Sequence, residues 1–498
     1  MHDSKLPHPI TGKKIYFVGI KGTGMSALAE LFHKAGAIVS GSDTEEIFYT
    51  DSILKQLGIK YKEGFNESNL DNDYDLVIHS SAYNRETNPD IKEAVKRGLP
   101  LMEYTEALGA YSKNIPSCGI AGVHGKTTTT GITGTLLKEM DLPVSVLAGS
   151  AISNFGGKST FVSGTDYFIA ETCEYKRHFL SFFPDIMIIT SIEPDHLDYF
   201  KDYNDIFGAF FSYAEKLPKD GVLIYCKDDK GANLLGDTVA EKRKDIKLIP
   251  YGIKAEGSFK IENIKQCSGI TKFNIAGLKN ELSLQIPGVH NVLNSAAAIA
   301  ATVFINSSIT GNSVEEVLKK ESTNIAAGLK NYKGSKRRSE LLGTACNITF
   351  MDDYAHHPTA IETTLSGIKS FFPGKRIILD FMSHTYSRTH ALMEEFSNSF
   401  GNADIVIINK IYASAREKNS NFGDLNRIFF DKIAEKHDKV FYYHEPDDVQ
   451  DFVKKELKVG DLFLTMGAGD NWKLGVKLYD YYKQLESQEK TGTDRRIK

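Results

Sequence analysis

Short apolar runs alternate with helical stretches from the start of the chain. Ile15 to Ile20 is a compact apolar run that predicts a buried strand, and after a glycine-rich turn the segment Met25 to Ala35 has the residue spacing of a helix. Two more strands are predicted at Ala37 to Ser40 and at Asp75 to His79. Each strand ends in small or polar residues, which is typical of a doubly wound, α/β fold with a parallel sheet.

The alternation restarts at Ser117. A strand from Cys118 to Ala121 leads into a glycine-containing loop and then into a threonine-rich helix start. We therefore expect the first domain boundary near Ser112. The region continues with two buried strands and an alanine-rich helix, predicted at Tyr167 to Ala170, Ile186 to Thr190 and Asn291 to Val303.

A second alternating sheet is predicted in the final part of the chain. The basic, glycine-containing stretch Lys330 to Arg338 indicates a linker ahead of it. The carboxyl ends of strands in such a sheet are where a binding site forms. Three apolar runs, each ending in polar or glycine residues, are the predicted strands: Arg376 to Phe381, Asp404 to Asn409 and Asp461 to Met466.

The composition is typical of a globular protein and excludes several functions. With 498 residues, 41% of them apolar, and 60 basic against 64 acidic side chains, the chain is predicted to form two to four globular domains that bind no nucleic acid. The polar start, Met1 to Lys14, and the lack of a run of about 18 apolar residues predict a cytoplasmic protein without a membrane segment. The five cysteines have no CxxC spacing, so neither a zinc site nor a disulfide framework is expected.

The loop that begins at Gly122, GVHGKTTT, carries the clearest chemistry in the sequence. Between a strand and a helix, the backbone N–H groups of such a loop converge on phosphate oxygens, while Lys126 faces the outer phosphates and Thr127 offers a hydroxyl to Mg2+. Ile120 stands where an ordinary Walker motif has its first glycine, so a plain turn before a structural helix is the alternative. The predicted ATP contacts here are Gly122, Val123, His124, Gly125, Lys126, Thr127 and Thr128.

Acidic residues follow the next two predicted strands. Glu171 and Glu174 come after one strand, and EPDHLD, which contains His196, comes after the other. Carboxylates and an imidazole at the edge that carries a phosphate loop can hold Mg2+, which neutralises charge during phosphoryl transfer. Structural hydrogen bonding is the alternative for these residues. The predicted metal ligands are Thr127, Glu171 and His196.

The segment HNVLN, from His290 to Asn294, precedes the alanine-rich helix. Asn291 fits the N-cap of that helix, where its side chain would accept a backbone hydrogen bond. An amide can also bond the edge of adenine. The spacing leaves both interpretations open.

These elements occur in the order found in one protein family. From about Ile15 to Asp470 the chain resembles the Mur ligases, and the N-terminal GIKGTGMSALAE is similar to that of the branch that adds L-alanine. The resemblance implies an ATP- and Mg2+-dependent enzyme that joins L-alanine to the lactyl carboxylate of UDP-N-acetylmuramate and is a monomer or a weak homo-oligomer. The motifs that carry the resemblance are GVHGKTTTT, EPDHLDYF, HNVLNSAAA, RRSE, DDYAHHPT, SHTYSRT and GAGD.

The resemblance also implies three domains and a set of site residues. Residues 1–112 would form a Rossmann-like domain for the UDP-sugar, 113–333 a central ATPase with a mainly parallel sheet, and 334–498 a second Rossmann-like domain. The implied UDP-sugar contacts are Gly22, Gly24, Met25, Ser26, Asp43, His79 and Ser81. Further ATP contacts are implied at His290, Asn291, Asn294, Arg338 and Asp353, amino-acid or phosphate contacts at Tyr354, His384 and Arg388, and catalytic roles at Lys126, His196, Arg388 and His356.

Three positions depart from the family pattern. The element from Glu171 to Glu174 is less acidic than the common form, which leaves metal ligation by Glu174 in doubt. Thr385 stands where the family commonly has an arginine, so a phosphate contact that this arginine could make is not expected here. Phe211 stands near the position at which several other Mur ligases carry a carbamylated lysine, so we expect a metal site without a carbamate.

Three other functions would also use parts of this pattern. Gly19, Gly22 and Gly24 form a weak dinucleotide fingerprint that would suit an oxidoreductase, but the GKT loop argues against it. A recycling ligase that attaches an intact tripeptide to the same acceptor is the nearest rival. A non-catalytic nucleotide sensor is the third, although a pure binder needs no groups for both metal binding and phosphoryl transfer.

Overall fold

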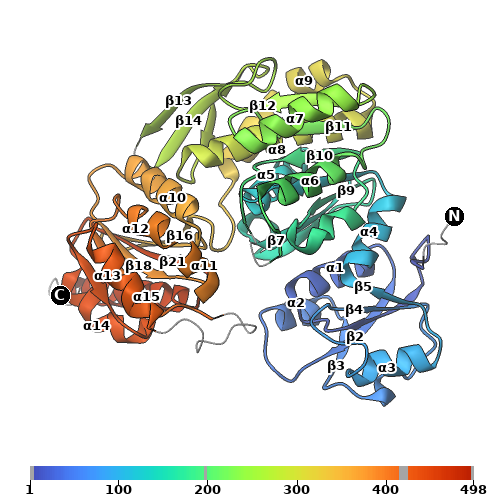
Figure 1. The fold of residues 1–498 in the computed structure, drawn as a ribbon, viewed down its shortest axis with the longest axis horizontal. Helices are drawn as coiled ribbons and strands as arrows, with labels where there is room; N and C mark the ends of the chain where they lie inside the picture. Colours follow the sequence, from blue (N-terminus) through green and yellow to red (C-terminus); the bar gives the residue numbers. More distant parts are fainter. Residues whose placement is uncertain (1–4, 196–198, 268, 414–423, 495–498) are drawn as a thin grey trace. The chain divides into compact units, whose positions relative to one another are not determined.

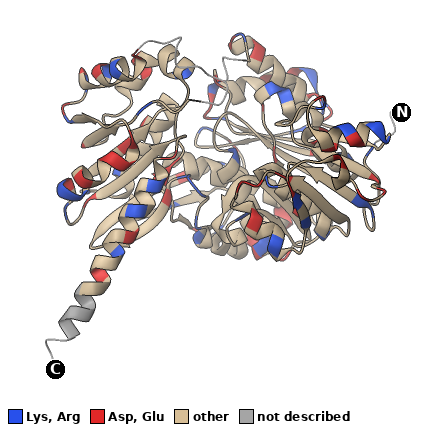
Figure 2. Ribbon diagram, turned by 90° about the horizontal axis from the view of Figure 1, so that it is seen from below, with Lys and Arg blue, Asp and Glu red and all other residues tan. Residues whose placement is uncertain are grey.

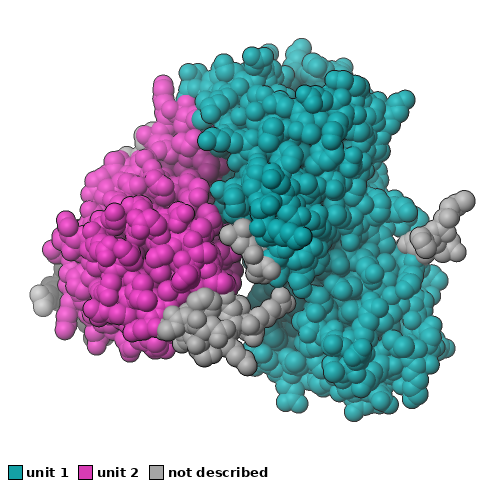
Figure 3. Space-filling model, in the orientation of Figure 1, with its two compact units in different colours: residues 1–263, 273–282, 293–333 teal, residues 264–272, 283–292, 334–498 magenta. Residues whose placement is uncertain are grey.

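The computed structural model describes residues 5–195, 199–267, 269–413 and 424–494. The chain divides into two compact units, which Figure 3 draws in different colours. Unit 1 contains residues 1–263, 273–282 and 293–333. Unit 2 contains residues 264–272, 283–292 and 334–498.

Unit 1 begins with a parallel sheet of five described strands in the order β3-β2-β1-β4-β5 (Figure 1). The central strand β1 pairs with both β2 and β4, so the strand order reverses beside it. A doubly wound sheet opens its crevice at this reversal, beyond the carboxyl ends of the strands. The strands are β1 (Lys14–Val18), β2 (Ile38–Asp43), β3 (Lys60–Glu63), β4 (Leu76–His79) and β5 (Leu101–Glu103), and the helices are α1 (Thr23–Lys34), α2 (Thr50–Gln56), α3 (Pro89–Lys96) and α4 (Tyr104–Asn114).

The second sheet of unit 1 has seven strands within the described residues, in the order β12-β11-β10-β6-β9-β7-β8. All neighbours are parallel except the hairpin of β7 and β8. The strands are β6 (Ser117–Ala121), β7 (Val144–Ile152), β8 (Lys158–Val162), β9 (Tyr167–Glu171), β10 (Ile186–Ile189), β11 (Val222–Cys226) and β12 (Lys247–Tyr251). The helices are α5 (Lys126–Glu139), α6 (Tyr203–Ala214), α7 (Lys230–Lys242) and α9 (Val314–Asn331), with a 3-10 segment η3 (Tyr175–Ser181).

A small sheet and a long helix belong partly to each unit. The sheet contains β13 (Ile261–Cys267), β14 (Ile270–Ile275) and β15 (Leu282–Leu284). Helix α8 (Val289–Thr310) is the one described helix that is long and apolar enough to cross a membrane, an exception to the expectation that no such run exists. Because 72% of its apolar window is buried inside the protein, α8 is explained as a core helix.

Unit 2 contains a sheet of six described strands in the order β16-β17-β21-β18-β19-β20. Only β16 runs antiparallel to its neighbour. The strands are β16 (Glu340–Ala345), β17 (Ile348–Asp353), β18 (Ile377–Met382), β19 (Ile405–Ile408), β20 (Val440–Tyr442) and β21 (Leu462–Gly467). The helices are α10 (Pro358–Phe371), α11 (Tyr386–Ala391), α12 (Met393–Asn398), α13 (Leu425–Ala434), α14 (Gln450–Glu456) and α15 (Trp472–Asp494).

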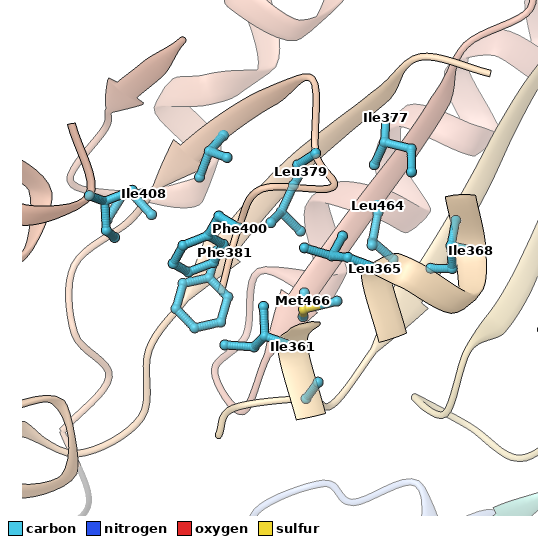
Figure 4. Packing of buried hydrophobic residues seen from close by; sticks show 14 of the residues in the cluster. Ile361, Leu365, Ile368, Ile377, Leu379, Phe381, Phe400, Ile408, Leu464 and Met466 are labelled. Atoms are coloured by element: carbon cyan, nitrogen blue, oxygen red, sulfur yellow. The ribbon is translucent and has the colours of Figure 1, made fainter. Parts of the chain in front are cut away.

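Both faces of this sheet are apolar because helices cover both. Leu379 and Phe381 of β18 pack with α10, α12 and α13, as the close-up in Figure 4 shows for Ile361 and Leu365 of α10. Ile378, one position along, packs on the opposite face with α14 and α15. Successive side chains of a strand point to opposite faces, so a strand covered on both sides reads as an unbroken apolar run.

The predicted α/β class and the predicted strands are confirmed, with ends shifted by a few residues. Ser112, near which we expect the first domain boundary, lies inside α4, and β6 begins at Ser117. Asn291 is not an N-cap, because α8 begins before it, at Val289. Basic and acidic residues are interspersed along the helices, as on α15 in Figure 2.

Candidate active site

The loop after β6 has the backbone shape of a phosphate loop. Gly122 and Gly125 have φ angles of 136° and 83°, in the region that favours glycine. A Cβ at Gly122 would lie 2.0 Å from Thr190 Oγ1, and one at Gly125 would lie 2.4 Å from Asn294 Oδ1. Both glycines are therefore required by close packing as well as by the turn.

The strand beside β6 supports this loop. The backbone N–H groups of Val123 and His124 donate to Ser191, at 3.1 Å to its carbonyl and 3.0 Å to its hydroxyl. His124 Nε2 lies 2.5 Å from Glu193 Oε1. Helix α5 then begins at Lys126 with no side-chain cap, so its first N–H groups remain for a ligand.

Lys126 is held by the buried carboxylate of Glu174. Its Nζ lies 3.1 and 3.0 Å from the two carboxylate oxygens and donates to the Gly122 carbonyl at 2.5 Å. Burial is the largest effect and lowers the pKa of Lys126, but Glu174 and the other acidic groups around it together raise the pKa above its ordinary value. The ammonium therefore stays protonated at the position where it can face phosphates.

Thr127 and Glu171, two of the predicted metal ligands, lie together. Thr127 Oγ1 donates to Glu171 Oε2 at 2.8 Å, and the Gly149 N–H donates to the same oxygen at 2.7 Å. The third predicted ligand, His196, lies outside the described residues. Among the residues that are described, no group of three His, Cys, Asp or Glu side chains could hold a metal by itself.

The predicted adenine residues lie on the first turns of α8. Asn294 is buried and contacts the loop glycine, Gly125. Asn291 is also buried, and its Nδ2 donates to the Pro287 carbonyl at 2.6 Å. His290 belongs with Asn291 to unit 2, whereas Asn294 belongs to unit 1.

Four of the predicted UDP-sugar contacts, Gly22, Gly24, Met25 and Ser26, lie at the amino end of α1. Gly22 is the N-cap and contributes no side-chain hydrogen bond, so the N–H groups of the first turn can meet an anion. Gly24 is packed against Tyr104, whose Cζ would lie 3.0 Å from an added Cβ. Met25 and Ser26 are buried, and the Ser26 hydroxyl donates to the Thr23 carbonyl at 3.1 Å.

Asp43 and His79, also predicted to contact the UDP-sugar, are bonded within the protein. The Asp43 carboxylate accepts from the Lys21 N–H at 2.6 Å and from the Tyr83 hydroxyl at 3.0 Å. His79 is buried, which lowers its pKa, and its Nε2 accepts from Arg85 Nε at 3.1 Å. These two side chains hold the strand ends in place around the crevice.

A cavity of about 350 Å3 joins these two regions of unit 1. Thr23, Gly24 and Ser81 line it from the first sheet, with residues of α4. Glu171 and His178 line it from the second sheet, with residues of β7 and η3. This volume is within the range of small-molecule sites, and its wall contains a candidate metal ligand.

In unit 2 the RRSE and DDY elements meet at the ends of β16 and β17. The Asp353 carboxylate accepts from the Ser339 N–H at 2.6 Å and from the Ala355 N–H at 2.7 Å. The guanidinium of Arg338 lies 5.2 Å from the centre of the Tyr354 ring, a cation–π contact. Asp353 thus shapes the turn that presents Tyr354.

Two histidines lie close to each other in unit 2. The rings of His356 and His384 are 5.9 Å apart and nearly perpendicular, and His356 Nδ1 is 2.8 Å from the Tyr354 carbonyl. Thr385 has a φ of 66°, which strains a β-branched residue, and its hydroxyl caps α11 by accepting from the Arg388 N–H at 3.4 Å. The residue that replaces the family's arginine therefore positions the helix that carries Arg388.

Sequence reasoning missed three contributors to this geometry. No motif indicates that the carboxylate of Glu174 pairs with Lys126. No motif points to Tyr83, whose hydroxyl donates to Asp43, or to His178, which lines the cavity. Of these three residues, only His178 could have been predicted from the sequence, because it follows the acidic residues at the end of a predicted strand.

A phosphate loop on a central parallel sheet, built into one unit with a Rossmann-like sheet, defines a P-loop nucleotide-binding protein of the α/β class. Three family models match the chain: "Mur ligase family, catalytic domain" at residues 14–115, "Mur ligase middle domain" at 120–302 and "Mur ligase, glutamate ligase domain" at 337–469. The chain belongs to the Mur ligase family.

Individual relatives agree with this assignment over nearly the whole chain. The UDP-N-acetylmuramate–L-alanine ligase of Treponema pallidum (strain Nichols) is 46% identical over 485 residues, covering 97% of this chain and 100% of the relative. The protein of the same name from Borreliella burgdorferi is 41% identical, covering 92% and 97%. The crystal structure of UDP-N-acetylmuramate-alanine ligase from Thermotoga maritima has a TM-score of 0.72 at 25% identity, covering 95% and 99%.

Proposed function

We propose that the chain is an ATP-dependent ligase that joins L-alanine to the lactyl carboxylate of UDP-N-acetylmuramate in the synthesis of peptidoglycan precursors. Two relatives at 46% and 41% identity carry the corresponding name. The observation that carries the proposal is the cavity whose wall combines the amino end of α1 with Glu171, which bonds Thr127 of the phosphate loop. An acceptor in this cavity would reach from a diphosphate site to the nucleotide.

The reaction needs activation because a carboxylate has no good leaving group. In the proposed reaction a lactyl carboxylate oxygen attacks the γ-phosphorus of ATP, ADP leaves, and an acyl phosphate forms. The amine of L-alanine then attacks the acyl carbon, and the tetrahedral intermediate expels inorganic phosphate. Lys126, kept protonated beside Glu174, would stabilise the charge on the transferring phosphoryl group.

We propose that residues of unit 2 accept a proton from the attacking amine and contact the nucleotide. His356 Nδ1 lies 2.8 Å from the Tyr354 carbonyl, which places the hydrogen on Nδ1 and the acceptor lone pair on Nε2. That nitrogen could take the proton that the attacking amine loses. We propose that His384, Arg388 and Tyr354 contact phosphate or amino acid, and that Arg338 and Asp353 belong to the nucleotide site.

We further propose that Mg2+ is the metal cofactor. The hydroxyl of Thr127 and the carboxylate of Glu171, 2.8 Å apart, are hard oxygen donors of the kind that Mg2+ prefers. A site with few protein ligands fits Mg2+, which takes its remaining ligands from nucleotide phosphates and water. Bound there, the metal would neutralise the charge that develops between ATP and the acceptor.

One assay tests the proposed function against its rivals. ADP release is measured with UDP-N-acetylmuramate and, separately, L-alanine, glycine, L-serine and the tripeptide L-Ala-γ-D-Glu-diaminopimelate. We expect the fastest release with L-alanine. Faster release of ADP with the tripeptide would identify a recycling ligase, and no release of ADP with any of the four amines would indicate a sensor. The three-domain division, the cytoplasmic location and the monomeric or weakly oligomeric state are proposed with the function.

A further inference from the structure

Glu30, in the middle of α1, carries a carboxylate that is almost completely buried: its side chain is 2% exposed. A buried carboxylate is costly unless cations and hydrogen-bond donors compensate it. Two of the three partners of Glu30 come from another sheet. Oε1 accepts from Lys158 Nζ at 3.1 Å, and Oε2 accepts from the hydroxyl of Thr160, both on β8.

The third partner, Lys34, lies on α1 itself. Its Nζ is 3.5 Å from Glu30 Oε1, one helical turn away, and its side chain is about one-third exposed. This contact helps to compensate the negative charge of Glu30, but it does not link α1 to another element. Lys158 and Thr160 are therefore the partners through which Glu30 joins α1 to the second sheet of unit 1.

Thr160 lies next to a strand that lines the cavity. It is the registered partner of Leu147 in the β7–β8 hairpin, and Leu147 and Gly149 line the cavity. The Gly149 N–H bonds Glu171, and Glu171 accepts from Thr127 of the phosphate loop. On the other side, α1 itself supplies Thr23 and Gly24 to the same cavity. A short chain of contacts thus runs from the amino end of α1 through Glu30 to the phosphate loop.

We propose that Glu30 is a positioning residue that fixes α1 on β8 and so sets the two walls of the acceptor cavity at the correct separation. The inference rests on the proposed function, because it assigns the cavity to the UDP-sugar acceptor. A buried charge with specific partners can fix how two elements pack on each other. The bonds of Glu30 form in only one arrangement of α1 on β8, and a shifted arrangement would leave the buried carboxylate without them.

Three variants test this role. Glu30→Gln keeps the size of the side chain and removes the charge, and Thr160→Val removes the hydroxyl that reaches it. Lys34→Met is the matched control, since it removes the Glu30 contact that stays within α1. Calorimetry of the full chain then measures the affinity for UDP-N-acetylmuramate and, separately, for ATP.

We expect Glu30→Gln and Thr160→Val to weaken UDP-N-acetylmuramate binding by about tenfold or more, because a misplacement of about 1 Å in a site can cost up to about a hundredfold in function. ATP affinity should stay at the wild-type value in both, since the phosphate loop keeps its own contacts. Lys34→Met should bind both ligands normally. If Glu30→Gln and Thr160→Val lose thermal stability but bind the UDP-sugar like the wild type, Glu30 is merely structural and the proposal is wrong.

A readout without ligand separates this inference from the proposed function. Lys113 is exposed near the end of α4, just before the stretch that joins the two sheets of unit 1. Trypsin should cleave after Lys113 faster in Glu30→Gln than in the wild type or in Lys34→Met, and equal rates in all three would overturn the positioning role. A wild-type chain that binds no UDP-N-acetylmuramate would refute the proposed function, while the cleavage rates would still decide the role of Glu30.

Discussion

The Nζ of Lys126 lies 3.0 Å from Oε2 of Glu174, and both side chains are removed from solvent, at 14% and 2% exposure. The carboxylate keeps the lysine protonated and directs it along the phosphate loop. The same contact makes Lys126 a structural residue, because Glu174 depends on it for charge compensation. Loss of the lysine therefore affects stability as well as chemistry.

Lys126→Met should abolish ligation and also destabilise the chain by about 3 to 5 kcal/mol, since it breaks a buried ion pair. The double variant Lys126→Met with Glu174→Gln should recover most of that stability without recovering activity. Urea unfolding followed by circular dichroism and an ADP-release assay measure the two effects. An active Lys126→Met chain would contradict the role of the phosphate loop, and a double variant no more stable than the single one would contradict the ion pair.

Asp380 predicts a pH dependence of unit 2. Its carboxyl is fully buried on β18 and accepts from Asn471 Nδ2 at 2.9 Å and Asn409 Nδ2 at 3.2 Å. Burial raises its pKa from 3.8 to about 7. Between these values the folded chain binds a proton that the unfolded chain has released, so stability falls as the pH rises towards 7 and levels off above it.

Asp380→Asn should remove this slope and make unit 2 more stable than the wild type above pH 7, by up to about 4 kcal/mol at roughly 1.4 kcal/mol per tenfold change in proton affinity. The new amide has an acceptor available, because the buried Oδ1 of Asn409 has no hydrogen-bond partner in the described part of the chain. Trp472 is the single tryptophan and lies in unit 2, so its fluorescence reports unfolding there. Parallel stability curves for the two proteins from pH 5 to pH 8 would refute the assignment.

Amino-acid selectivity should be modest among small side chains and strong against peptides. A pocket that accepts one methyl group discriminates by about 1 to 3 kcal/mol, so glycine should be used about 10 to 200 times less efficiently than L-alanine. L-Serine should also be a slow substrate. The measurement is kcat/KM for each amine at saturating ATP and UDP-N-acetylmuramate. Equal efficiency for alanine and glycine would exclude a methyl-sized pocket.

The metal site should work without a carbamylated lysine. Helix α6 carries Phe211, Lys201 precedes it, and Lys216 follows it with its ammonium 3.7 Å from the centre of the Phe183 ring. Removing bicarbonate from the assay should leave the rate unchanged, and Lys201→Ala and Lys216→Ala should each remain active. If either variant lost activity and regained it with a short-chain carboxylate, the helix would carry the modified lysine after all.

The sequence predicted what depends on local pattern and missed what depends on distant contacts. Strands β6 and β18 were found because strands buried on both faces read as continuous apolar runs. The β7–β8 hairpin was missed, since its serines and glycines interrupt the apolar pattern. The phosphate loop was found from its glycines and GKT. The Lys126–Glu174 pair could not be predicted, because its residues are 48 positions apart and Glu174 lies just before a turn in which Lys176 and Arg177 both have positive φ.

Because unit 2 is built from three stretches of sequence, its C-terminal region cannot simply be exchanged between related ligases. Residues 264–272 and 283–292 belong to unit 2 although unit 1 residues lie on both sides of each. Gly269 donates its N–H to the Phe371 carbonyl, and Gly367 packs so closely on Gly288 that an added Cβ would lie 2.8 Å from its Cα. A chimaera spliced once, after Lys333, would set these two segments against foreign surfaces. A working transplant of the C-terminal region must carry all three pieces, so the region cannot recombine as a single cassette.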